Sequence, residues 1–145
     1  MDFTIQQFLD MFHRYNEAIW PMQIVGYGIG VFIVAMLVAR LRGPRSFLAS
    51  HAVIDRLLPA LLCYFWVWIG VVFMWGYQAD ISASGRPFGV LFLIGAVAFG
   101  VAALVGADLG LGRVQSWRLA IGGSMVVYAM LIYPLLGALA GHTYQ

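Results

Sequence analysis

Residues 88–107 read FGVLFLIGAVAFGVAALVGA, and no Asp, Glu, Lys, Arg or His interrupts them. Three other stretches share this property, at residues 22–39, 57–76 and 119–141. In chain order the four stretches hold 18, 20, 20 and 23 residues. Because a helix needs about 20 apolar residues to cross the roughly 30 Å hydrocarbon layer of a bilayer, the pattern predicts an integral membrane protein with four spanning helices.

The composition of the whole chain indicates the same class. Of the 145 residues, 63% are hydrophobic and 10% are charged, and the mean hydropathy is +0.89. Four spans in a chain of this length leave no room for a separate water-soluble domain. We therefore expect one membrane domain over residues 1–145, an all-α four-helix bundle preceded by a short amphipathic helix.

The segment before the first span has the pattern of that amphipathic helix, over about residues 4–15. Thr4 and Gln7 form a capping-box pair at its start. Apolar residues then recur at helical spacing and make one stripe: Ile5, Phe8, Leu9 and Phe12. Such a helix is expected to lie in the membrane interface with this stripe toward the lipid bilayer.

The eight basic residues are all arginines, and their placement predicts an orientation. Most lie around the first and third gaps between spans: Arg40, Arg42, Arg45, Arg56, Arg113 and Arg118. Because short basic loops stay in the cytoplasm, we expect both termini outside, in a bacterial inner membrane. We interpret these arginines as topology signals and expect no nucleic-acid partner, because no interleaved aromatic pattern accompanies them.

The absence of charged residues from the spans restricts the chemistry. Proton relays and ion-coupled carriers normally need ionisable side chains inside the membrane. A single cysteine, Cys63, excludes an intramolecular disulfide, and the three histidines lack the spacing of metal ligands. We therefore predict no catalytic residue, no metal site and no resident cofactor, and we expect that the protein is not an enzyme.

Two further features of the spans concern packing. Aromatic residues near the centre of the second span, Phe65, Trp66 and Trp68, are candidates for lining a cavity for a flat apolar ligand such as a quinone or carotenoid. Packing against protein or lipid is the simpler interpretation of these rings. Small residues four positions apart predict close helix contacts, at Gly26 and Gly30, Ala96 and Gly100, and Gly137 and Gly141.

Two prolines fall within the predicted spans. Pro59 is expected in the first turn of the second span, where its missing N–H has no consequence. Pro134 lies about two-thirds along the fourth span, where it is expected to free the carbonyl of Met130 and to kink the helix.

Several motifs resemble an uncharacterised bacterial family of small multi-span membrane proteins that is known only as a domain of unknown function. They are FTIQQF at residues 3–8, YNEAIWPMQI at 15–24, WVWIG at 66–70, YPLLG at 133–137 and GHTY at 141–144. That family usually has Tyr-His where Phe73-Met74 stands, and it continues into further spans with a Pro-Cys-Pro segment. The resemblance therefore implies a reduced form, such as a subunit.

The same motifs suggest a polar cluster at the outer face. Its candidate members are Asn16, Trp20, Gln23, Tyr133 and His142, which would meet if the first and fourth spans were neighbours. The family has no established activity, so the resemblance adds to the architecture and little to the function.

Three functions remain open from the sequence. The first is a non-enzymatic membrane subunit or homo-oligomer that packs through Gly and Ala faces. The second is a small channel or facilitator for a neutral solute, lined by tyrosines, Ser124 and Gln23. The third and weakest is a protein that binds a lipophilic cofactor.

Overall fold

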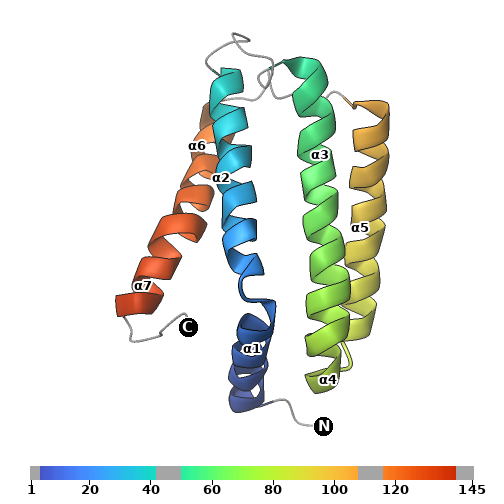
Figure 1. Ribbon diagram of the computed structural model, residues 1–145, viewed down its shortest axis with the longest axis vertical. Coiled ribbons are helices and arrows are strands. Elements are labelled where there is room, and N and C mark those ends of the chain that lie inside the picture. Colours follow the sequence, from blue (N-terminus) through green and yellow to red (C-terminus); the bar gives the residue numbers. More distant parts are fainter. Residues whose placement is uncertain (1–3, 42–49, 108–115, 140–145) are drawn as a thin grey trace. The chain divides into compact units, whose positions relative to one another are not determined.

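The computed structural model describes residues 4–41, 50–107 and 116–139, and all regular secondary structure within these ranges is helical (Figure 1). The elements are α1 (Ile5–Ile19), α2 (Met22–Leu41), α3 (His51–Val67), η2 (Trp68–Gln78), α4 (Ala79–Ile81), α5 (Gly85–Val105), α6 (Ser116–Val127), η4 (Tyr128–Ile132) and α7 (Tyr133–Leu139). The chain divides into two compact units, Met1–Asp108 and Leu109–Gln145. The all-α prediction is confirmed.

Helix α1 begins with the predicted capping box. The Thr4 hydroxyl accepts a hydrogen bond from the Gln7 backbone N–H at 3.2 Å, and the Gln7 side-chain oxygen accepts one from the Thr4 N–H at 3.1 Å. Two of the unpaired N–H groups at the helix start are thus satisfied. The helix continues to Ile19, beyond the predicted end at residue 15, and stops where Trp20 is extended before Pro21.

The predicted second span lies inside a longer continuous helix formed by α3, η2 and α4. Its apolar segment, Ala52–Ile81, has 30 residues. In η2 the turns widen to a π-helix, and at its end the Ala79 N–H donates to the Met74 carbonyl, five residues back.

The expectation for Pro59 was wrong. Because α3 begins at His51, Pro59 lies in the helix interior, where it is less than 2% exposed. Its ring has no N–H to donate to the carbonyl of Asp55, four residues earlier.

Helix α5 runs back along α3 and η2 after a short turn, and it contacts both (Figure 1). It ends at Val105 because Gly106 adopts a left-handed conformation, with φ 65° and ψ 51°, which a residue with a Cβ disfavours. The Arg56 side chain from α3 lies against this end of α5, since its Nε is 3.2 Å from the place of a Cβ on Gly106.

Within the described ranges, three helices are long and apolar enough to cross a membrane: Met22–Ala39, Ala52–Ile81 and Gly85–Val105. A shorter apolar helical segment, Ile121–Leu136, falls in the predicted fourth span. Just before Pro134 the second unit contains the π-helical turns of η4, where the Tyr133 N–H donates to the Tyr128 carbonyl. The kink at Pro134 stays a prediction.

Few side chains are buried in this structure. The apolar ones are Met11, Met36, Ile54, Leu58 and Ala96. Large apolar side chains are instead exposed along α2, α5 and the second unit, as in Val31, Val97 and Leu135, which are 59%, 67% and 62% exposed. Exposed apolar side chains along a helix suit contact with lipid or with another membrane helix.

Candidate functional site

Trp66 is the central contact between α3 and α5. Its ring lies between Phe92 and Phe99, with centroid distances of 5.2 and 5.4 Å. A Cβ on Gly95 would overlap the same indole ring. Phe92, Gly95 and Phe99 follow one another at helical spacing, so they form a socket on α5 for this indole.

A second close approach joins η2 to the start of α5. A Cβ on Gly70 would stand 3.1 Å from the Gly89 carbonyl oxygen, and one on Gly89 would overlap the Trp75 ring. The Trp75 indole N–H donates to the Arg86 carbonyl at 3.2 Å. The glycines therefore let two backbones and one indole occupy a space that larger residues would block.

Helix α1 packs on η2 through a cluster of aromatic side chains centred on Tyr15. The Tyr15 ring contacts Phe73 and Tyr77 edge to face, with centroids 5.1 and 5.3 Å apart, and Phe12 contacts Phe73 at 5.4 Å. The Trp68 indole N–H donates to the Tyr15 hydroxyl at 3.0 Å. Part of the apolar stripe of α1 therefore faces protein, whereas Ile5 remains 78% exposed.

Burial raises the pKa of the Tyr15 phenol above its ordinary value. The hydrogen bond from Trp68 acts in the opposite direction, because a donor stabilises the phenolate oxygen. Sequence reasoning missed this residue, although its seven-residue spacing from Phe8 places it on the same helix face.

The three aromatic cofactor candidates do not face one space. Trp66 faces α5 and Trp68 bonds to α1, while the Phe65 ring contacts the neighbouring Tyr64 ring at 5.6 Å. The Tyr64 ring also contacts the Trp68 ring at 6.1 Å, so Phe65 and Trp68 share this neighbour. All three rings thus contact protein side chains, which favours packing over a shared ligand cavity.

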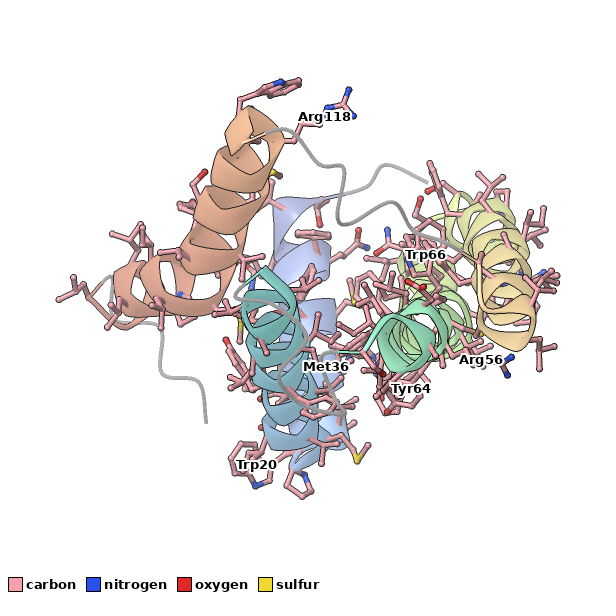
Figure 2. The ribbon with its side chains drawn as sticks, turned by 90° about the horizontal axis from the view of Figure 1, so that it is seen from above. Trp20, Met36, Arg56, Tyr64, Trp66 and Arg118 are labelled. Atoms are coloured by element: carbon pink, nitrogen blue, oxygen red, sulfur yellow. The ribbon has the colours of Figure 1, made fainter. Side chains whose placement is uncertain are left out.

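Of the five outer-face candidates, the structure brings two together. The Gln23 amide donates to the Asn16 side-chain oxygen at 3.2 Å and lies 3.4 Å from the Asn16 carbonyl, which ties α2 to α1. Trp20 is 59% exposed and extends away from the ribbon (Figure 2). Tyr133 belongs to the second unit, and His142 lies outside the described residues.

The small residues that were predicted to make close helix contacts lie in different surroundings. Ala96 is 2% exposed, and a Cβ on Gly100 would stand 3.5 Å from the Cys63 sulfur, so both lie on the face of α5 toward α3. Gly26 has no atom within 4 Å of its Cβ position. Gly30 is half-exposed in α2, and Gly137 lies in α7. Gly141 falls outside the described residues.

Two of the polar side chains proposed for a solute path, Ser124 and Gln23, are hydrogen-bonded locally. The Ser124 hydroxyl donates to the Ile121 carbonyl of its own helix at 2.9 Å, and Gln23 is bonded to Asn16. His13 and Glu17 form an exposed pair at 3.4 Å on α1. Within residues 4–41, 50–107 and 116–139, no three His, Cys, Asp or Glu side chains come together as metal ligands.

Comparison with known proteins gives one match. The chain belongs to a family of unknown function, DUF6064, whose profile matches residues 5–145. No curated protein and no solved structure matches it. The expected resemblance to a family of unknown function is thus confirmed, while its individual motifs and bacterial origin stay predictions.

Proposed function

From this membership, we propose that the protein is a non-catalytic, multi-span membrane protein that works by binding other membrane helices. It does so as a homo-oligomer or as a subunit beside a different membrane protein. In this proposal residues 119–141 supply a fourth span and both termini lie outside a bacterial inner membrane, as the arginine distribution favours.

The observation that carries the proposal is the open surface of α2. Gly26 has no atom within 4 Å of its Cβ position, and Gly30, four residues later on the same face, is half-exposed. Among the α2 residues whose exposure is described, only Met36 is buried. A spanning helix with open glycines can approach another backbone closely, and this close packing is what drives association in lipid.

The association is tested with two substitutions of equal size on α2. Gly26→Leu fills the face that includes Gly30, and Gly28→Leu is the control because it fills the other side of the same helix. We expect Gly26→Leu to lower the oligomeric fraction about tenfold and Gly28→Leu to leave it unchanged, measured by single-molecule photobleaching in lipid vesicles. A wild-type protein that stays monomeric in vesicles and in native membranes would refute the proposal.

The orientation has its own test. Reporter fusions after residues 45 and 114 are expected to read cytoplasmic, and fusions after residues 82 and 145 periplasmic. The inverse pattern would overturn the orientation without affecting the proposed association.

A further inference from the structure

An open groove of about 320 Å³ lies where η2 meets the start of α5, and it is lined by Trp75, Arg86 and Val90. The Trp75 ring is held there because its N–H donates to the Arg86 carbonyl. With its only donor occupied, the indole presents an apolar surface to the groove.

Arg86 is the charged residue among those that line the groove, and its side chain is exposed. In the part of the chain that the structure describes, no carboxylate lies within 4.0 Å of it. Arginine stays charged at any ordinary pH, and its planar fork of N–H donors matches a phosphate group. This cation is therefore available to an anion from outside the protein.

A row of exposed apolar side chains continues from the groove along α5. Val90, Ile94, Val97 and Val101 are 48%, 62%, 67% and 53% exposed and follow Arg86 at helical spacing. The distance from Arg86 to Val97 along the helix is about 16 Å, roughly half of the hydrocarbon thickness. The order of cation, interfacial aromatic ring and apolar row is that of a lipid headgroup followed by its acyl chain within one leaflet.

We propose that this groove binds one anionic phospholipid, with its phosphate on Arg86 and an acyl chain along Trp75, Val90 and the row beyond. The site goes beyond the proposed association and does not depend on it, since it requires only that α5 spans the bilayer. Arg86, which lies outside the charge-free stretches, is the residue that selects anionic lipids in this proposal.

The test is native mass spectrometry of the full chain in detergent, titrated with dioleoyl phosphatidylglycerol. Arg86→Gln is expected to weaken retention of the first lipid about tenfold or more, because a charge-assisted hydrogen bond is lost. Arg86→Lys keeps the charge and is expected to retain most of the binding. Arg14→Gln is the matched control, since it removes the same charge from the exposed face of α1.

Four comparisons decide the result. Equal losses in Arg86→Gln and Arg14→Gln would show diffuse surface charge and overturn the site. Equal binding of dioleoyl phosphatidylcholine would overturn the preference for an anionic lipid. Competition by millimolar inorganic phosphate would indicate a free-anion site instead. Val90→Phe adds bulk to the groove without changing its charge, and it is expected to weaken lipid binding.

Discussion

Helices α5 and α2 both contain several glycines, but the surroundings of these glycines differ. On α5 the rings of Trp66 and Trp75 lie where a Cβ of Gly95 or Gly89 would stand. On α2 no atom lies within 4 Å of the corresponding place on Gly26. Glycine thus permits close approach in both helices, but the sequence does not show which side chain lies beside it in either one.

The difference comes from the neighbouring element. Helix α5 follows the continuous helix of α3, η2 and α4 after a short turn, so it is held beside a helix rich in aromatic side chains. Helix α2 follows the short helix α1, which contacts it only near the junction through Asn16 and Gln23. A glycine is therefore covered where chain connectivity delivers a large side chain to it, and open elsewhere.

The largest effect is expected from removing the indole that fills the α5 socket. Trp66→Ala should lower the free energy of unfolding by about 3 kcal/mol, because Phe92, Gly95 and Phe99 lose their common partner. Reversible unfolding in mixed dodecyl sulfate micelles measures it. Val67→Ala is the control, since Val67 is 41% exposed, and it should cost less than about 1 kcal/mol. Equal costs would contradict the socket.

The comparison itself is tested by placing one substitution in both helices. Gly95→Leu should destabilise the protein by about 2 kcal/mol through overlap with Trp66, whereas Gly26→Leu should change the stability of the monomer by less than about 0.5 kcal/mol. The double variant Trp66→Ala with Gly95→Leu should lose less unfolding free energy than the two single variants lose together, because the new leucine occupies the space that the indole vacates. Additive costs would show that the two residues do not share a site.

A smaller effect is expected where α1 meets η2. Tyr15→Phe keeps the ring against Phe73 and Tyr77 but leaves the half-buried Trp68 N–H without its acceptor, which should cost about 1 kcal/mol. Loss of α1 docking can be measured as faster amide hydrogen exchange in α1, with exchange in α5 unchanged. Unchanged exchange in α1 would mean that the ring contacts alone fix this helix.

Much of the fold follows from the sequence because lipid imposes a strong length requirement. The charge-free stretches predict the three long helices, and Thr4 with Gln7 predicts the start of α1. Boundaries were less accurate, as at Pro59, because a helix can continue past its apolar segment to include residues such as Asp55 and Arg56.

The packing could not be predicted in the same way. In a membrane both the lipid-facing and the protein-facing sides of a helix are apolar, so hydrophobic periodicity does not separate them. Phe65, Trp66 and Trp68 look equivalent in the sequence, and yet Trp66 packs on α5 while Trp68 bonds to α1. The groove beside Arg86 could not be predicted either, because it depends on how η2 and α5 approach each other.

The smallest expected effect uses Tyr15 as a pH probe of the α1 contact. Because burial raises its pKa above 10.0, the folded state favours the neutral phenol. The resulting stability is complete below the unfolded pKa of about 10 and is lost as the pH rises through the folded pKa. The free energy of unfolding, measured between about pH 9 and about pH 11, should therefore fall more steeply with pH for the wild type than for Tyr15→Phe. Parallel curves would contradict a buried phenol and leave α1 free of η2, which would make α1 as open as α2.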